Sequence, residues 1–310
     1  MSFSNGSQGK KKRKGFILVS ILLVMTLLVA GATGYAWFAR NQLKILSSEK
    51  FALQSRGIAY AAVLQIAKGL QYDDNDFDSY TEPWFQKQFI PIPDLGMVII
   101  DIAPLDDKIP LNELFLPDGA TLRAEMDHTW KELWNLYGNS RAGTIILDFI
   151  DKDKRPRLGG LELDLYPNRD LADISELRIL GEHLEGVLPA PPMVPRLEDL
   201  VTIWCSGKIN LNVAPYSVLL MIDGINENAA QEIIEFRQGS PLESMEDLER
   251  SSTSFENSAV PRIVNLVGFK SSYFRVSVQV RSLMDQSVNN YSAILLKESS
   301  SCRIVKWEEN

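Results

Sequence analysis

An uncharged apolar run over residues 16–39 follows directly on a basic cluster over residues 10–14, and this pairing constrains the chain more than any other feature. As a helix, these 24 residues would rise about 36 Å, enough to cross a hydrocarbon core of roughly 30 Å. Basic clusters are retained on the cytoplasmic side of a membrane span. The run therefore predicts a single-pass transmembrane helix, with everything after Arg40 outside the cytoplasm.

The junction between the two segments is similar to the leader of a type IV prepilin. A prepilin peptidase cuts such leaders after a small residue and leaves the apolar helix on the mature chain, so the resemblance implies cleavage between Gly15 and Phe16 and methylation of the new amino terminus. The alternatives are a secretory signal cut near residues 30–32 and an uncleaved anchor. Most pilins carry a glutamate at the fifth mature position, where this chain has Ser20.

Residues 40–70 predict that the transmembrane helix continues as an amphipathic spindle helix. Ile58, Ala62 and Ile66 share one apolar stripe, and a second apolar stripe lies beside it. The first proline of the chain is Pro83, so nothing interrupts a helix before that point. A continuous helix favours the prepilin-type leader, because a secretory signal normally ends at a turn.

The composition predicts an exported mixed domain behind the anchor. The length of 310 residues exceeds one typical core, which favours two modules. Removal of the basic leader shifts the formal charge from −8 to −13, because 27 Lys and Arg then face 40 Asp and Glu. An acidic surface disfavours nucleic acid and suits divalent cations. Cys205 and Cys302 are the only cysteines, and outside the cytoplasm either a disulfide or two free thiols is allowed.

Strand patterns lie at both ends of the region after the spindle, and helical patterns lie between them. The expected strands are residues 97–102, 273–281, 290–297 and 302–307, and the prolines between 83 and 93 predict a loop. The expected helices are residues 119–137, 173–183, 214–222 and 227–238. The predicted class is therefore α+β, with the spindle helix packed on a small antiparallel sheet (residues 71–103 and 268–310). A large all-α domain (residues 104–267) is expected to be inserted between its strands.

The acidic segment 147–166 is the most distinctive part of the insertion. Asp151, Asp153 and Glu162 have the spacing of positions 1, 3 and 12 of an EF-hand loop, but an arginine and a proline at positions 5 and 6 break that pattern. Hard oxygen ligands still suit calcium, and Asp148 and Asp164 lie nearby. The alternative is a solvated acidic loop. A second acidic cluster, residues 73–78, is a weaker candidate for a metal site.

Residues 208–237 predict a helix, a tight turn at Gly224 and a second helix, similar to a helix-hairpin-helix. Such hairpins bind DNA phosphates through backbone N–H groups at a helix start. Carboxylates surround this turn, at Asp223, Glu227, Glu232 and Glu235, and they would repel phosphate. A structural α-hairpin is therefore favoured and no nucleic acid is expected. The rival hypothesis is a membrane-anchored DNA receptor of the competence type.

Four segments together resemble the GspK family of minor pseudopilins of type II secretion. They are the leader with Ser20, the acidic segment 147–166, the tract Ser175-Glu-Leu-Arg178 and the phrase Ile209-Asn-Leu-Asn-Val-Ala-Pro215. The resemblance covers nearly the whole chain. It implies a pseudopilin fold with an inserted α-domain and structural calcium in the acidic region.

The resemblance also implies a place at the tip of the pseudopilus, where the subunit initiates and caps assembly together with the I and J minor pseudopilins and the major pseudopilin. The expected location is the inner membrane, with the C-terminal domain in the periplasm. The Ile58–Ala62–Ile66 stripe is the expected partner surface. No enzymatic activity is expected, because the only histidines, His128 and His183, lie near no nucleophile or metal-ligand motif.

Overall fold

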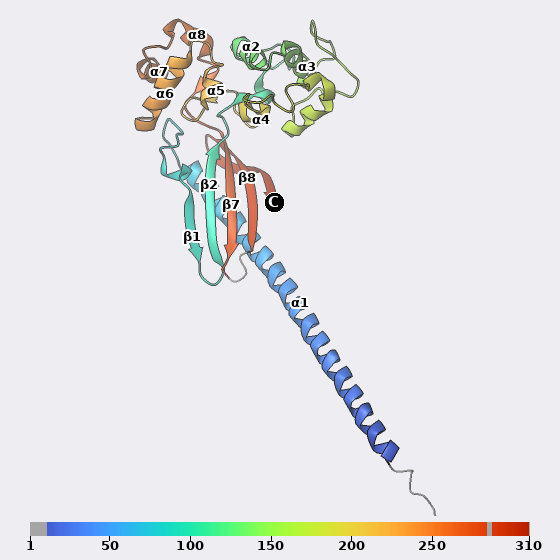
Figure 1. The fold of residues 1–310 in the computed structure, drawn as a ribbon. Coiled ribbons are helices and arrows are strands. Elements are labelled where there is room, and N and C mark those ends of the chain that lie inside the picture. The colour runs from blue at the N-terminus through green and yellow to red at the C-terminus, as the bar shows by residue number, and fades with distance from the viewer. Residues whose placement is uncertain (1–10, 284–286, 310) are drawn as a thin grey trace, which may run out of the picture. The chain divides into compact units, whose positions relative to one another are not determined.

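The computed structural model describes residues 11–283 and 287–309, and for residues 11–15 it describes the backbone only (Figure 1). The first ten residues of the expected leader therefore lie outside the described residues. The chain divides into two units, Met1–Gly57 and Ile58–Asn310. Helix α1 (Lys11–Gln71) belongs to both units.

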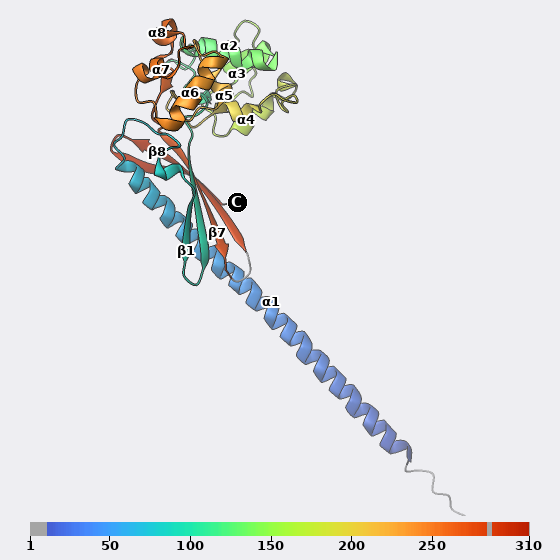
Figure 2. The ribbon, with the colours of Figure 1, turned by 60° about the vertical axis from the view of Figure 1, so that its left-hand side comes forward.

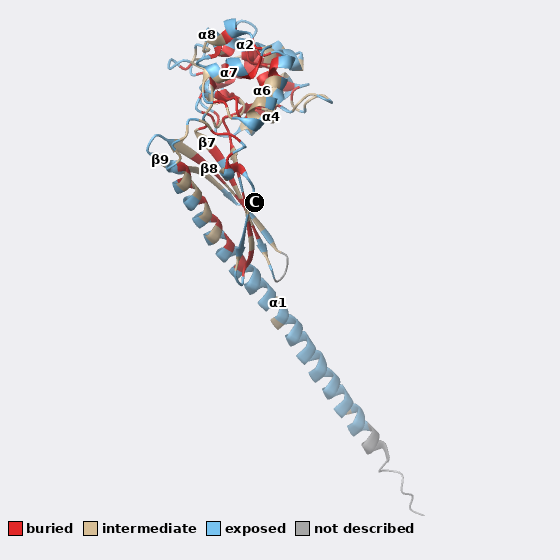
Figure 3. Cartoon of the chain, turned by 90° about the vertical axis from the view of Figure 1, so that its left-hand side faces the viewer, coloured by how far each residue is buried: buried red, intermediate tan, exposed pale blue. Residues whose placement is uncertain are grey.

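In the first unit, α1 exposes its apolar side chains along residues 16–46, and Figure 3 shows this part of the helix in the colour of exposed residues. The helix is long and apolar enough to cross a membrane. Ser20 satisfies its own hydroxyl by donating to the carbonyl of Phe16 at 2.8 Å. Soluble proteins rarely expose an apolar surface of this size, and a lipid bilayer would cover it.

The second unit contains a five-stranded antiparallel sheet in the order β1-β2-β7-β8-β9 (Figure 1). Its strands are β1 (Gln88–Ile92), β2 (Gly96–Pro104), β7 (Tyr273–Ser282), β8 (Val288–Glu298) and β9 (Ser301–Glu309). The central pairing of β2 with β7 places Ile100 opposite Val278. Because side chains alternate between faces, one face of β2 and β7 is apolar and buried, and the other face is more exposed.

The C-terminal part of α1 covers the apolar face of the sheet (Figures 1 and 2). Its buried residues are Ala59, Val63, Ala67 and Leu70, which repeat with helical spacing. The two alanines allow the helix to approach the strands closely. At the edge of the sheet, Tyr60 packs edge-on against Trp307 of β9, with ring centroids 5.5 Å apart.

The region between β2 and β7 holds most of the other helices, and its apolar side chains form a core (Figures 2 and 3). The α-helices are α2 (Met126–Tyr137), α3 (Ser140–Ile150), α4 (Leu197–Leu200), α5 (Tyr216–Leu219), α6 (Glu227–Gly239), α7 (Met245–Ser251) and α8 (Val260–Ile263). The 3-10 helices are η2 (Leu111–Glu113), η3 (Ile174–Leu184) and η4 (Asn257–Ala259), and η1 (Pro83–Phe85) precedes β1. The predicted α+β class, with a long N-terminal helix, an antiparallel sheet and additional helices, is confirmed.

Several local predictions are wrong. The expected loop at residues 88–92 is strand β1, where Pro91 is accommodated because the strand lies at the edge of the sheet. Helix α2 begins only at Met126, because the Asp118 carboxylate accepts the N–H groups of Ala120 and Thr121 and holds a turn there. The expected helix 173–183 is the 3-10 helix η3, which is interrupted at Gly181 with φ 51°.

Two further differences concern the insertion. Helix α3 was not predicted, although it precedes and enters the acidic segment. The region is also not purely α-helical, because β3 (Ile109–Pro110) pairs with β4 (Val201–Thr202) and β5 (Ile209–Asn210) pairs with β6 (Val267–Gly268), both in parallel. The expected helix 227–238 is confirmed as α6, whereas the one at 214–222 is shortened to the four residues of α5.

Candidate functional site

The acidic segment starts in the last turn of α3, where Asp148 is fully buried. The Asn139 side chain caps the start of this helix by accepting from the N–H of Ala142 at 3.0 Å. The Asp148 carboxylate accepts the N–H of Leu161 at 2.9 Å and a guanidinium N–H of Arg157 at 2.9 Å. It thereby folds the following loop back onto the helix. Gly160 is required there, because a Cβ at this position would collide with Asp148 Oδ2.

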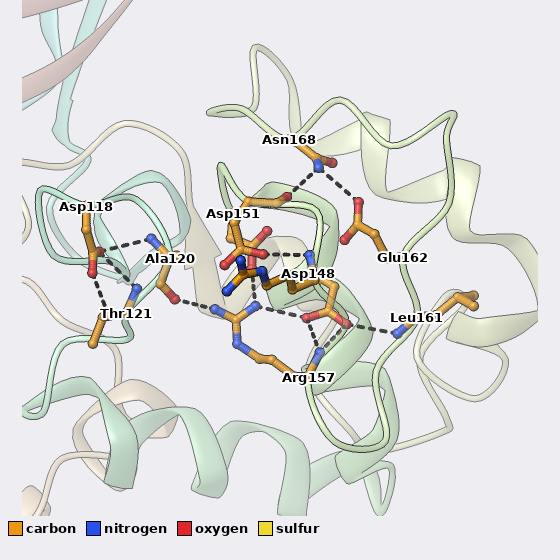
Figure 4. A network of polar contacts seen from close by, with 11 residues as sticks. Asp118, Ala120, Thr121, Asp148, Asp151, Arg157, Leu161, Glu162 and Asn168 are labelled. Atoms are coloured by element: carbon orange, nitrogen blue, oxygen red, sulfur yellow. Dashed lines mark hydrogen bonds and ion pairs between the residues drawn. The ribbon is translucent and has the colours of Figure 1, made fainter.

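Arg157 is the central cation of this loop (Figure 4). Its guanidinium also pairs with Asp151, donates to the carbonyl of Ala120 and lies 5.3 Å from the ring centroid of Phe115. Burial raises the pKa of Asp151 to about 6, although the hydrogen bond and charge of Arg157 lower it. The arginine therefore compensates part of the buried negative charge.

The outer half of the loop is held by Asn168, whose amide nitrogen donates to the carbonyl of Asp153 at 2.6 Å and to Glu162 Oε1 at 2.9 Å (Figure 4). The Asp153 carboxylate accepts the N–H of Arg155 at 2.7 Å. Asp164 is exposed. The structure thus brings Asp153 and Glu162 to one asparagine, and Asp148 and Asp151 to one arginine.

Four buried oxygen atoms in this loop have no hydrogen-bond partner among the described residues. They are Asp151 Oδ1, Glu162 Oε2, Asn168 Oδ1 and the hydroxyl of Tyr166. Buried polar atoms are normally satisfied, so this concentration requires a ligand, an ion or water. Carboxylate and amide oxygens at such a place fit the ligands that calcium prefers. The described residues contain no group of three or more His, Cys, Asp or Glu side chains placed to hold a metal, so a donor set here would have to include amide and carbonyl oxygens.

Sequence analysis did not single out Arg157, Asn168 or Tyr166. Nothing local marks Arg157 among the basic residues of the loop, since its role depends on Phe115 and Ala120, far away in sequence. Asn168 carries a weak signal, because asparagine tolerates the left-handed backbone that it adopts with φ 45°. The oxygens of Asp148 accept N–H groups, and its role as a metal ligand stays a prediction.

The helix-hairpin-helix segment is closed off by its own chain. Gly224, with φ 82°, makes the turn between α5 and α6, and its carbonyl accepts the N–H of Glu256 at 3.0 Å. A Cβ on Gly224 would collide with Ala259, and Asp223 is paired with Arg262. The turn that would face a phosphate backbone is therefore packed against residues 255–259.

The other predicted site residues are dispersed. Ile58, Ala62 and Ile66 are half-buried and flank the stripe that packs on the sheet. Cys205 and Cys302 are free thiols in this structure and do not form a disulfide. Burial raises the pKa of Cys302 to about 11. Gly15 lies within α1, and Phe16, the residue after the expected cut, is exposed.

Comparison with known proteins supports the same architecture. The helix-hairpin-helix motif family matches residues 206–253. No curated protein matches the sequence. Among solved structures, a chain of the GspK-GspI-GspJ complex from the type 2 secretion system of enterotoxigenic Escherichia coli is similar, with a TM-score of 0.58 and 15% identity over 88% of this chain and 99% of that chain. This chain has a pseudopilin-like fold.

Proposed function

We propose that the protein is a minor pseudopilin of the K type, a structural and non-enzymatic subunit at the tip of the type II secretion pseudopilus that initiates and caps its assembly for export across the outer membrane. The supporting observation is the extent of the structural likeness. A match over 88% of the chain cannot be limited to α1 and the sheet, because the region between β2 and β7 makes up more than half of the sequence.

The anchor agrees with this role. An apolar helix near the amino terminus would hold the chain in the inner membrane, with the remainder in the periplasm. The glutamate of most pilins is thought to meet the amino terminus of the subunit ahead, and a subunit at the tip has none ahead. Ser20 at this position is therefore consistent with a tip subunit, and the bulk of the insertion would be tolerated at a tip better than inside a shaft.

The partners proposed here are the I and J minor pseudopilins and, below them, the major pseudopilin. Co-expression of the full chain with its I and J counterparts should give a detergent-soluble complex with one copy of each, measured by native mass spectrometry. Ile58→Glu should weaken it at least about tenfold, because one apolar side chain at an interface contributes about 1.5–3 kcal/mol. Lys68→Glu, on an exposed position of the same helix, is the control. A chain that stays monomeric with both partners, or that labels the whole filament, would refute the proposal.

The acidic loop is proposed to bind structural calcium through Asp151, Asp153, Glu162 and Asn168, with Asp164 close enough in sequence to contribute. The ion would supply positive charge to the unsatisfied oxygens, and Asp148 would position the loop. Removing calcium held at about 100 times its Kd should cost about 2.7 kcal/mol of stability, measured as a lower melting temperature in EGTA. Asp151→Asn should abolish this response, whereas Asp170→Asn, on an exposed residue nearby, should keep it. An unchanged melting temperature after chelation of a sample shown to contain metal would end the idea.

The match to the helix-hairpin-helix family favours the DNA-receptor hypothesis, which we place second. The packing of Gly224 against Ala259 and the pairing of Asp223 with Arg262 leave little room for a phosphate at the turn. Four acidic side chains near it would also repel DNA. Retention of the full chain on DNA-cellulose at moderate salt would favour the receptor over the pseudopilin.

A further inference from the structure

The loop between the end of α1 and strand β1 carries a second acidic cluster, in the sheet-containing part of the chain. Asp74 and Asp76 point to solvent, but three other acids do not. The side chain of Asp73 is 8% exposed, and residues Asp78 and Glu82 are 1% and 7% exposed. Buried carboxylates are rare unless something compensates their charge.

These side chains tie the loop to itself and to the segment just before β7. Asp78 Oδ2 accepts the N–H of Ser271 at 2.7 Å. Glu82 Oε1 accepts from the Asn75 amide at 2.6 Å, and Glu82 Oε2 accepts the N–H of Ser79 at 2.9 Å. Asn75 and Glu82 are therefore in direct contact, and Asp78 lies in the short stretch of chain between them.

Two oxygens of this turn have no hydrogen-bond partner among the described residues, although both are buried. They are Asn75 Oδ1 and Asp78 Oδ1. Of the charged groups here, Lys297 pairs with Asp73 at 3.0 Å, and Lys270 pairs with Asp76 at the surface. Three carboxylates thus share the one ammonium group of Lys297, whose side chain is 15% exposed, which leaves two negative charges uncompensated by the ion pairs of the described residues. A bound cation would satisfy the free acceptors and compensate the surplus negative charge together.

We propose that this turn binds a hard divalent cation, best matched by calcium, through Asn75 Oδ1, Asp78 Oδ1 and Glu82. All the donors are oxygens, which excludes metals that prefer sulfur or nitrogen. Calcium accepts six to eight ligands in irregular geometry, so carbonyls or water can complete the shell, whereas magnesium demands a regular octahedron. The ion would hold the loop after α1 to Ser271, which lies just before β7. This site is separate from the acidic loop after α3 and does not depend on the proposed secretion role.

Hydrogen–deuterium exchange of the full chain in mild detergent, with calcium chloride or EGTA, tests the proposal. Calcium should slow exchange at residues 72–86, with half-saturation at about 0.1–1 mM, as for other sites with few carboxylates outside the cytoplasm. At ten times the half-saturating concentration the slowing should reach about tenfold. Asp78→Asn, which keeps the acceptor for Ser271, and Glu82→Gln should each abolish it.

Two control variants separate the site from its surroundings. Asp76→Asn changes an exposed acid on the same loop, and Asp151→Asn changes the other proposed calcium loop, so both should retain the calcium response at residues 72–86. A wild-type loop indifferent to calcium would overturn the proposal, as would an equal response in Asp78→Asn and wild type. Protection that follows pH between 5 and 7 but not calcium would also overturn it, because a proton would then compensate the charge. Circular dichroism checks that both loop variants are folded.

Discussion

Asp148 shows how a buried carboxylate can organise the loop that follows α3. Its position in the last turn of α3 is fixed by the helix, and its oxygens collect N–H groups from Arg157 and Leu161. The charge is tolerated because the guanidinium of Arg157 lies against it. The acidic loop is thus held by the two ion pairs that Arg157 makes with Asp148 and Asp151.

Asp148→Asn should destabilise the chain by about 3 kcal/mol, because it removes one of the two buried carboxylates that pair with Arg157 and turns an amide N–H donor toward other N–H donors. Urea unfolding in mild detergent measures the change. Asp127→Asn is the matched control, since Asp127 pairs with Lys131 on the surface of α2 and should cost less than about 0.5 kcal/mol. Equal losses in the two variants would contradict a central role for Asp148.

The raised pKa of Cys302 predicts that its thiol is alkylated slowly. Only the thiolate reacts, and with a pKa of about 11 it forms about one part in a thousand at pH 8. Alkylation of Cys302 by iodoacetamide in the native chain should therefore speed up about tenfold per pH unit between pH 8 and 10. Cys205 is buried, and because burial raises its pKa well above the ordinary value, it should react only after unfolding. If denatured protein takes up label only after reduction, the cysteines are paired and this expectation fails.

At the scale of elements, Asp106 joins the sheet to the insertion. It follows β2 and is fully buried. Asp106 Oδ1 accepts the N–H and the hydroxyl of Ser206, at 2.7 and 2.8 Å, and Oδ2 accepts the N–H groups of Ser272 and Tyr273, both at 2.9 Å. Burial raises its pKa, although these hydrogen bonds lower it. One side chain therefore accepts the backbone N–H groups at the point where the chain leaves the insertion and enters β7.

Asp106→Asn should cost about 2–4 kcal/mol, because an amide has one acceptor oxygen and its NH2 group would face two N–H donors. Urea unfolding again gives the value. Asp101→Asn, on an exposed residue of β2 that pairs loosely with Lys87 at 3.6 Å, should change stability by less than about 0.5 kcal/mol. A small loss for Asp106→Asn would mean that the junction is held elsewhere.

At the scale of the whole molecule, removal of the leader decides whether the mature chain begins with the apolar part of α1. Gly15→Leu should block removal of the leader, because the peptidase requires a small residue before the cut, and intact mass spectrometry of protein from its native membrane would then show the full-length chain. Gly34→Leu is the control, since a side chain there meets no neighbour within 4 Å and the cleavage site is unchanged. A wild-type chain that begins near Thr33 would contradict a prepilin leader.

The sequence alone was sufficient for elements that depend on local pattern. The apolar run predicted the N-terminal part of α1, and strand patterns predicted β7, β8 and β9, because hydrophobic periodicity acts within a few residues. The acidic segment was also located from sequence. The spacing of its acidic residues suggested several metal ligands, but it did not predict which other side chains surround them.

Tertiary structure decided what depends on residues far apart. Pro91 is tolerated in β1 only because that strand ends up at the edge of the sheet, and a proline in a local window predicts a loop instead. Arg157 acquires its role from contacts with Phe115 and Ala120. Asp106 acquires its role from Ser206 and Tyr273, which are 100 and 167 residues away in the sequence. Periodicity records which face of an element is buried, whereas the partner of a buried charge is set only when distant segments pack and water is excluded.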